Sequence, residues 1–208
     1  MRLYDPTEGR ILYNGKDIRC YDLVSYREKI VAVFQDYRLF CATLAENVVG
    51  GMYAHSEEND TTVTAALDSA TFGDRLETFP KGLDTALAKD LDETGVNLSG
   101  GEAQKVAIAR VFVRPYELII MDEPSSALDP MAEYELNHSI LNAADSVDRT
   151  VVFISHRLST TRFADRIYLF AEGELAEYGS HEALLMKNGR YAEMFKMQAE
   201  KYRRGEEC

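Results

Sequence analysis

Residues 118–123 read Leu118-Ile119-Ile120-Met121-Asp122-Glu123, four apolar side chains followed at once by two carboxylates. An apolar run of this length is typical of a strand that is buried on both faces of a parallel sheet. Open α/β sheets bind ligands at the carboxyl ends of such strands. Asp122 and Glu123 are therefore candidates for holding Mg²⁺ and for orienting a water molecule. A solvated sheet edge or a helix cap would give the same pattern.

Two further apolar runs predict more strands of the same sheet. They are Ile30-Val31-Ala32-Val33-Phe34 and Thr150-Val151-Val152-Phe153-Ile154. Residues 132–144 have a helical pattern, with Pro130 near its start, where proline is tolerated. Strand and helix thus alternate along the chain. This alternation predicts an α/β fold with a mainly parallel sheet and helices on its faces.

Two turn signals predict a small antiparallel β portion. Asn14-Gly15 separates two short strand-like stretches, which favours a tight hairpin. Glu172-Gly173 separates residues 166–170 from residues 174–178 in the same way. We expect two helices after the second hairpin.

Residues 42–115 are mostly helical in pattern. Ser56-Glu57-Glu58-Asn59-Asp60 reads as a solvated charged loop before a helix over 61–70, and another helix follows Leu98-Ser99-Gly100-Gly101-Glu102. The two glycines let the backbone approach a ligand closely, and the free N–H groups of a helix N-terminus bind phosphate oxygens. The structural alternative is a flexible turn in which Ser99 is an N-cap.

Single polar residues follow two of the other predicted strands. Gln35 comes directly after residues 30–34, and it could be either a metal ligand or a loop residue. His156 follows residues 150–154 by two positions. It could contact a phosphoryl group, or it could be a hydrogen-bonded histidine at a strand end.

Composition narrows the class of protein. The 208 residues are 46% hydrophobic and 28% charged, which suits one α/β domain with a small inserted subdomain. The formal net charge of −12 and the lack of a basic stripe argue against a nucleic-acid partner.

The three cysteines have no metal-ligand spacing, which indicates a reduced, intracellular protein. The apolar runs are too short to span a bilayer, so any membrane association would come from a partner or from a part outside these residues.

Taken together and in order, these segments resemble the motifs of ABC-type ATPases. The resemblance extends over essentially the whole chain. It includes Pro124, which follows the carboxylate pair, and the segment 126–129 just beyond it. Residues 34–40 and 179–191 are similar to exporter-type half-transporters. The segments that resemble the Q-loop, signature, Walker B, D-loop and H-loop are, in turn, Gln35, Leu98-Ser99-Gly100-Gly101-Glu102, Ile119-Ile120-Met121-Asp122-Glu123-Pro124, Ser126-Ala127-Leu128-Asp129 and His156.

The resemblance implies a division of the fold. Residues 1–41 and 116–208 would form a P-loop NTPase-like (RecA-like) core, incomplete at its N-terminus. Residues 42–115 would form an inserted α-helical subdomain that carries the signature.

The resemblance also implies roles within one copy of the chain. Asp122 and Gln35 would support Mg²⁺, and Glu123 would be the general base that activates water. His156 would contact the γ-phosphate of ATP.

Other roles would be played across a head-to-tail dimer. Ser99, Gly100, Gly101 and Glu102 would bind the nucleotide held by the opposing domain, with Ser99 and Gly101 at its γ-phosphate. Glu102 stands where the signature more often has glutamine. The segment Ser126, Ala127, Leu128 and Asp129 would shape the dimer interface.

The main departure from the family pattern lies at the start of the sequence. A phosphate-binding loop of the form G-x-x-x-x-G-K-[ST] does not occur in these 208 residues, because Gly15-Lys16 is followed by Asp17 and Arg10 stands where the first glycine should be. We expect the chain to be a fragment of a longer protein. The alternative is a short protein that lost its own site. In either case we expect residues 1–208 alone to be poorly stable, with exposed apolar faces, and inactive as an ATPase.

The resemblance thus predicts an ATP-hydrolysing domain that energises a membrane transporter, more specifically an exporter. Its partners would be ATP, a transmembrane domain and a second ATPase domain, at the cytoplasmic face of the plasma (inner) membrane. One alternative is a non-catalytic partner that lends its signature to another subunit's ATP. Another is a soluble ABC-type ATPase acting on DNA or ribosomes, which would usually carry a coiled-coil insertion or a second cassette.

Overall fold

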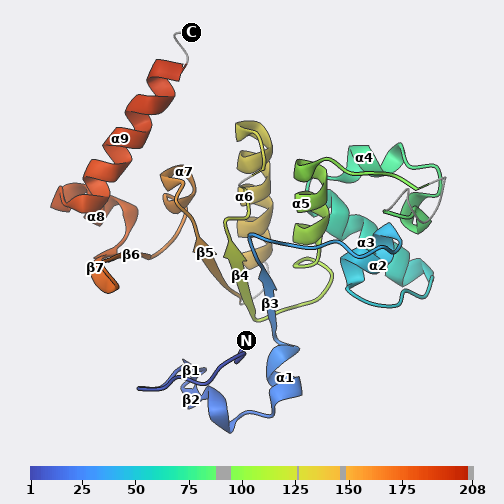
Figure 1. The fold of residues 1–208 in the computed structure, drawn as a ribbon, viewed down its shortest axis with the longest axis horizontal. Helices are drawn as coiled ribbons and strands as arrows, with labels where there is room; N and C mark the ends of the chain where they lie inside the picture. Colours follow the sequence, from blue (N-terminus) through green and yellow to red (C-terminus); the bar gives the residue numbers. More distant parts are fainter. Residues whose placement is uncertain (88–94, 126, 146–148, 206–208) are drawn as a thin grey trace. The chain divides into compact units, whose positions relative to one another are not determined.

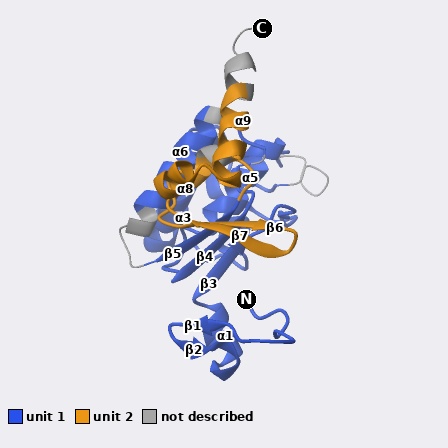
Figure 2. Ribbon diagram, turned by 90° about the vertical axis from the view of Figure 1, so that its left-hand side faces the viewer, with its two compact units in different colours: residues 1–154 blue, residues 155–208 orange. Residues whose placement is uncertain are grey.

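The structure of the protein is a computed structural model. It describes residues 1–87, 95–125, 127–145 and 149–205. The chain forms two compact units, residues 1–154 and residues 155–208 (Figure 2). The predicted subdomain boundaries at 41/42 and 115/116 stay a prediction, since the two units divide the chain elsewhere.

The first unit contains the predicted parallel sheet (Figure 1). Its three strands are β3 (Ile30–Val33), β4 (Leu118–Asp122) and β5 (Thr150–Ile154), in that order across the sheet. Both pairings are parallel, and they align Ile30 with Leu118 and Asp122 with Ile154. The carboxyl ends of all three strands therefore meet at one edge of the sheet, as the sequence predicted.

Helices of the first unit share one hydrophobic core with this sheet. Buried residues such as Leu67 and Ile108 belong to the same cluster as Met121 and Leu136. Figure 1 shows α2–α5 grouped beside the sheet, and α6 connects β4 to β5. The helices are α1 (Leu23–Arg27), α2 (Leu44–Val49), α3 (Glu57–Ser69), α4 (Gly73–Glu77), α5 (Gly100–Ala109) and α6 (Pro130–Asp145), with short 3₁₀ turns η1 (Ile18–Cys20) and η2 (Gly82–Asp84).

The prediction of a charged loop over residues 56–60 was wrong. Helix α3 begins at Glu57, because the Ser56 side chain accepts a hydrogen bond from the Asn59 N–H and caps the helix. The acids of the first turn favour this start, since negative charge is stabilised at a helix N-terminus.

A small hairpin precedes the sheet. Strands β1 (Leu12–Tyr13) and β2 (Lys16–Asp17) pair in antiparallel fashion around Asn14-Gly15, whose φ angles are 47° and 76°. Positive φ at both central residues is the mark of the tight turn that the sequence predicted. The Tyr13 hydroxyl donates a hydrogen bond to Glu117, and this contact attaches the hairpin to the start of β4.

The second unit holds the other predicted hairpin and the two following helices. Its small core contains Ile167, Leu184 and Tyr191, and the buried Glu177 carboxylate accepts hydrogen bonds from the Arg190 and Tyr191 N–H groups. The elements are α7 (Leu158–Thr161), β6 (Ile167–Ala171), β7 (Glu174–Gly179), α8 (His181–Lys187) and α9 (Arg190–Gly205).

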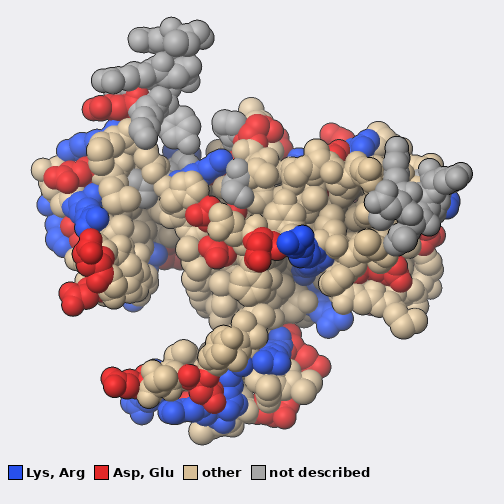
Figure 3. Space-filling view, in the orientation of Figure 1, with Lys and Arg blue, Asp and Glu red and all other residues tan. Residues whose placement is uncertain are grey.

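The fold can also be described by the distribution of its charged side chains and by the hydropathy of its helices. On the face drawn in Figure 3, Lys and Arg side chains are interspersed with Asp and Glu side chains. Within the described part of the chain, each helix is too short or too polar to cross a lipid bilayer.

Candidate functional site

The carboxylate pair lies at the carboxyl end of β4, where the sequence predicted it. Asp122 is the last residue of the strand, and the Glu123 N–H donates to the Ile154 carbonyl oxygen at 2.9 Å. Both side chains are half-buried. Glu123 has a φ of 49°, in the left-handed region that a residue with a side chain rarely adopts. Such outliers cost about 1–3 kcal/mol and cluster at functional sites.

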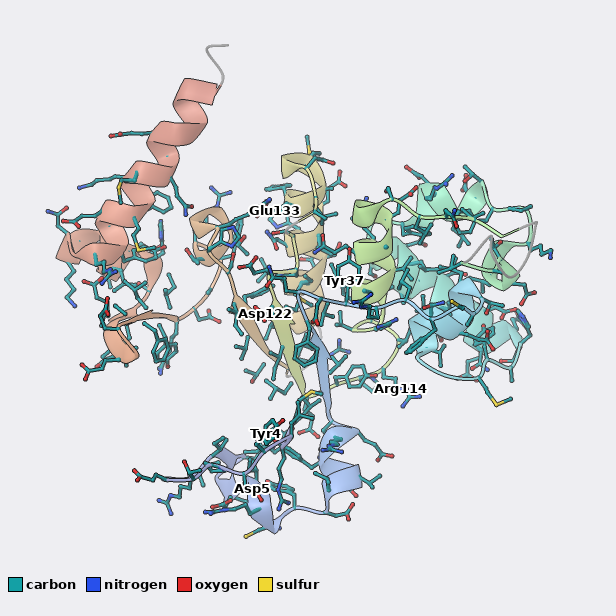
Figure 4. The ribbon with its side chains drawn as sticks, viewed as in Figure 1. Tyr4, Asp5, Tyr37, Arg114, Asp122 and Glu133 are labelled. Atoms are coloured by element: carbon teal, nitrogen blue, oxygen red, sulfur yellow. The ribbon has the colours of Figure 1, made fainter. Side chains whose placement is uncertain are left out.

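Gln35 contacts this pair from the neighbouring strand. It lies two residues beyond the end of β3, and its Nε2 donates to Glu123 Oε2 at 3.3 Å. The structure therefore brings together two predicted site residues that lie 88 positions apart in the sequence. Figure 4 marks Asp122 at the end of β4 and Tyr37 on the segment that leaves β3.

The donor atoms at this edge suit a hard cation. The carboxylates of Asp122 and Glu123 and the amide of Gln35 all offer oxygen, which is the ligand that Mg²⁺ prefers. Mg²⁺ in nucleotide sites takes only one or two protein carboxylates and leaves its other positions to phosphates and water. This donor set therefore fits Mg²⁺ shared with a phosphate.

The signature-like segment, residues 98–102, forms the start of α5. Ser99 is the N-cap: its hydroxyl accepts from the Glu102 N–H at 3.3 Å, and Glu102 Oε2 accepts from the Ser99 N–H at 2.7 Å. The Ser99 N–H lowers the pKa of Glu102, and the Arg75 guanidinium, 2.6 Å from Glu102 Oε1, lowers it further. The N-cap that the structural alternative assigns to Ser99 is thus confirmed. It does not exclude a phosphate contact, because a capped helix N-terminus still directs N–H groups outward.

Gln104 is a site residue that sequence reasoning missed. Its side chain is 1% exposed and it joins two backbone segments. Its Nε2 donates to the Glu123 carbonyl oxygen at 3.4 Å, and its Oε1 accepts from the Ala127 N–H at 3.0 Å. One signal could have found it: Gln104 is a polar residue one helical turn before the buried Ile108. Buried amides of this kind need partners.

The segment that resembles a D-loop packs against the same helix. A Cβ added at Gly101 would lie 3.1 Å from the Ala127 carbonyl oxygen and 3.7 Å from the Leu128 side chain. Asp129 is exposed and accepts hydrogen bonds from the first N–H groups of α6, those of Met131 and Ala132, both at 3.0 Å. The Ala132 N–H is the main cause of the lowered pKa of Asp129. The remaining predicted residue, Ser126, lies outside the described residues.

His156 belongs to the second unit. Its side chain is exposed, and its carbonyl oxygen accepts a hydrogen bond from Gln198 Nε2 at 2.7 Å. The residues brought together in the first unit are thus Gln35, Glu123, Gln104 and the two segments around Gly101 and Ala127. The proposed role of His156 stays a prediction.

Comparison with known proteins identifies a family that the sequence matches. The sequence profile described as ABC transporter matches residues 1–126. The structure is similar to that of a bacterial Atm1-family ABC exporter with ATP bound, with 40% sequence identity and a TM-score of 0.82 over 95% of this chain and 33% of that chain.

Three curated relatives each align with 95% of the chain. The ABC-type transporter fsqE of Aspergillus fumigatus is 38% identical. The mitochondrial iron-sulfur clusters transporter ATM1 of Candida glabrata and the ATP-dependent lipid A-core flippase of Cupriavidus metallidurans are each 39% identical. The chain spans 15%, 26% and 32% of the length of these relatives, respectively.

Proposed function

The chain belongs to the ABC transporter family, and from this premise we propose that residues 1–208 form part of the ATP-hydrolysing domain of an exporter. The observation that carries the proposal is the hydrogen bond between Gln35 and Glu123 at the carboxyl end of the sheet, beside α5. It joins two of the residues that such a site requires, from two different strands.

The carboxylates would divide the chemistry between them. Asp122, with the amide oxygen of Gln35, would hold Mg²⁺ against the phosphates. Bound Mg²⁺ would neutralise charge that develops on the transferred phosphoryl group. Glu123 would orient the attacking water and accept its proton, since its carboxylate is held in place by Gln35. His156 would contact the γ-phosphate.

The signature-like segment would act on a second ATPase domain. Ser99, Gly100 and Gly101 lie at the N-terminus of a ten-residue helix, where N–H groups and the helix dipole favour a phosphate. In a head-to-tail pair they would close over the ATP of the opposing domain, next to the segment 127–129. The loop that cradles the ATP itself would come from outside residues 1–208, since the required pattern is absent from them.

That absence favours a second candidate function. The chain could serve as a non-catalytic partner that completes another subunit's ATP site with Ser99 to Gly101. In this case Glu123 would not be needed for turnover.

The setting would be a membrane transporter. We infer that ATP hydrolysis in this domain drives a conformational change in a transmembrane domain. The ATPase domain would lie at the cytoplasmic face of the plasma (inner) membrane. The relatives include an iron-sulfur cluster transporter and a lipid A-core flippase, which differ in cargo, so a cargo for this chain is not proposed.

The test uses the intact protein that carries residues 1–208, purified with the subunits that it assembles with. MgATP hydrolysis is measured for the wild type, for Glu123→Gln and for Ser99→Arg. We expect each substitution to lower the turnover, Glu123→Gln by about 10²–10⁴-fold, because general-base catalysis contributes that much. Normal turnover in Glu123→Gln together with loss in Ser99→Arg would favour the second candidate. Normal turnover in both variants would contradict the proposal.

Co-expression of the two variants tests the shared site. A dimer of one Glu123→Gln copy and one Ser99→Arg copy contains one site with an intact glutamate and an intact serine. We expect a random mixture to regain about a quarter of the wild-type turnover, because half of the dimers are mixed and each mixed dimer has one competent site. No regain would show that Ser99 and Glu123 do not act across two copies.

A further inference from the structure

Tyr37 joins the strand-end site to the signature-like segment. Its hydroxyl donates a hydrogen bond to the Gly100 carbonyl oxygen at 2.7 Å, across 63 positions of sequence. The side chain is half-buried, and burial raises the pKa of the hydroxyl. The donor is therefore protonated throughout the neutral range. Gly100 is the first residue of α5, so the bond fixes the end of the helix that carries Ser99 and Gly101.

The same short segment also holds the proposed catalytic carboxylate. Gln35, two residues before Tyr37, donates to Glu123. The segment 35–37 therefore contacts both the Glu123 side chain and the start of α5. Removing the Tyr37 hydroxyl would break only the second of these contacts, because the first is made by Gln35.

The far end of α5 is attached to the same stretch of chain. Arg110, the C-cap of α5, donates from its Nε to the Asn47 carbonyl oxygen and from a terminal nitrogen to the Arg38 carbonyl oxygen, each at 2.9 Å. Its guanidinium lies 5.4 Å from the centre of the Phe40 ring, and burial lowers its pKa. Both ends of α5 are thus bound to residues 37–47.

The loop between these attachments is itself held firmly. Asn47 is fully buried, its Oδ1 accepts from the Phe40 N–H at 2.7 Å and its Nδ2 donates to the Phe40 carbonyl oxygen at 3.0 Å. Gln104 adds a third attachment between α5 and the backbone of Glu123. Rotating α5 away from the sheet would break four hydrogen bonds, and those of Arg110 to Asn47 and of Gln104 to Glu123 are partly buried, which makes them costly to leave unmade.

From these contacts we propose that Tyr37 is a positioning residue, which sets the place of the signature-like segment that its own copy lends to the ATP site of the other copy. The inference rests on the proposed function, because the lent segment matters only in a shared site. Tyr37 does not touch the nucleotide. It acts through the Gly100 carbonyl, so its effect appears at the site that this copy completes and not at the site that holds its own Glu123.

The mixed dimer described above separates these two sites. In the dimer of Glu123→Gln and Ser99→Arg copies, the Ser99→Arg copy supplies the working glutamate and the Glu123→Gln copy lends the working serine. Tyr37→Phe, which removes only the hydroxyl, is placed first in the lending copy and then in the copy with the working glutamate. Tyr116→Phe, which removes another half-buried hydroxyl just before β4, is the matched control.

We expect Tyr37→Phe in the lending copy to lower the maximal turnover by about two- to tenfold, the effect of losing one hydrogen bond of ordinary strength. In the other copy it should leave the turnover unchanged, as should Tyr116→Phe in either copy. Hydrogen exchange at the amides of residues 100–103 should accelerate in Tyr37→Phe.

The outcomes are distinct. Failure of the parent mixture to hydrolyse ATP contradicts the proposed function. A working parent mixture with equal loss in both placements shows a general structural role for Tyr37, and this overturns the inference. Loss only in the copy with the working glutamate, or no loss at all, overturns it too.

Discussion

At the residue scale, Gln104 connects parts of the site that are far apart in the sequence. Its two amide atoms bond the Glu123 carbonyl oxygen and the Ala127 N–H, and both contacts are partly buried. The Gln104 side chain itself is almost wholly buried. The backbone of Glu123 is therefore attached to α5 through Gln104, in addition to its bond to the Ile154 carbonyl oxygen.

Replacing Gln104 with leucine should lower the free energy of unfolding by about 1–3 kcal/mol, because two hydrogen bonds, each worth about 0.5–1.5 kcal/mol, are lost while the side-chain volume is kept. The measurement is urea denaturation of the intact protein. Glu135→Leu, at an exposed position on α6, is the control and should change stability by less than about 0.5 kcal/mol. Equal effects of the two substitutions would contradict the assigned role.

Sequence patterns predicted some of these residues but not others. Asp122, Glu123 and Gln35 could be found because each ends an apolar run, and the ends of parallel strands meet. Tyr37 could not be assigned, because its partner lies 63 positions away and a side-chain hydrogen bond leaves no periodic trace. The helical position of Gln104 indicated burial but not its partners, which lie 19 and 23 positions away. The left-handed backbone of Glu123 was equally hidden, since glutamate does not signal positive φ.

At the element scale, α5 begins with a reciprocal cap. Ser99 and Glu102 each accept the other's N–H, so two of the free donors of the helix are satisfied before any ligand arrives. The cap fixes the first turn, which contains Gly100 and Gly101. A ligand at this end would therefore meet a turn that is already formed.

Ser99→Ala should lower the free energy of unfolding by about 1 kcal/mol, the usual cost of losing a serine N-cap. Ser69→Ala is a matched control, since the Ser69 hydroxyl bonds the Ala65 carbonyl within α3 and caps nothing. It should change stability by less than about 0.5 kcal/mol. Urea denaturation of both variants decides the matter, and a cost for Ser99→Ala no larger than that for Ser69→Ala would refute the capping argument.

A second element-scale feature joins the segment before α3 to η2. His55 contacts Asp60 through Nδ1 at 2.9 Å and Asp84 through Nε2 at 2.8 Å, and both contacts raise its pKa, Asp84 more strongly. Asp60 also accepts a hydrogen bond from Tyr53, which is the main cause of its lowered pKa. The protonated imidazole is therefore favoured in the folded protein.

Stability should consequently depend on pH through His55. A raised native pKa gives a contribution that is fully present below the unfolded pKa of about 6.5 and is lost as pH rises through the native pKa. The pKa of Asp60 is lowered in the folded protein. The stabilisation that its carboxylate provides is therefore lost as the pH falls below about 4. Urea midpoints should fall between pH 6 and pH 8 more steeply for the wild type than for His55→Gln. Parallel profiles would contradict this assignment.

At the scale of the whole molecule, the sheet of the first unit presents apolar side chains on its last strand. Among the described residues β5 pairs with β4 alone, and Val152 and Ile154 are 43% and 53% exposed. Exposed β-branched residues on such a strand favour association with other chains. This agrees with the expectation that residues 1–208 by themselves expose apolar faces.

Val152→Lys should raise the fraction of residues 1–208 that runs as a monomer in gel filtration, because charged edge positions oppose strand pairing. Val151→Lys is the contrasting variant, since Val151 packs against the core and should destabilise the fold when charged. An unchanged monomer fraction in Val152→Lys would show that this strand does not drive association.

Nucleotide binding is a second property that can be tested on residues 1–208 as a whole. Residues 1–208 contain the proposed Mg²⁺ ligands but no phosphate-binding loop, so we expect no saturable MgATP binding in equilibrium dialysis. Adding a complete ABC ATPase domain should not create a site on this chain. Saturable binding by residues 1–208 alone would show that other residues replace the loop.

The attachment of α5 at both ends and at Gln104 has a genetic consequence. Under the proposed function, a copy whose whole α5 is displaced would disturb its own Glu123, through Gln104, and also the phosphate contact that it lends, so its normal neighbour would lose function with it. Alleles that displace the whole helix, at Gln104 or Arg110, should therefore behave as dominant in a cell that also carries the normal allele. Alleles that only remove the protein should be recessive.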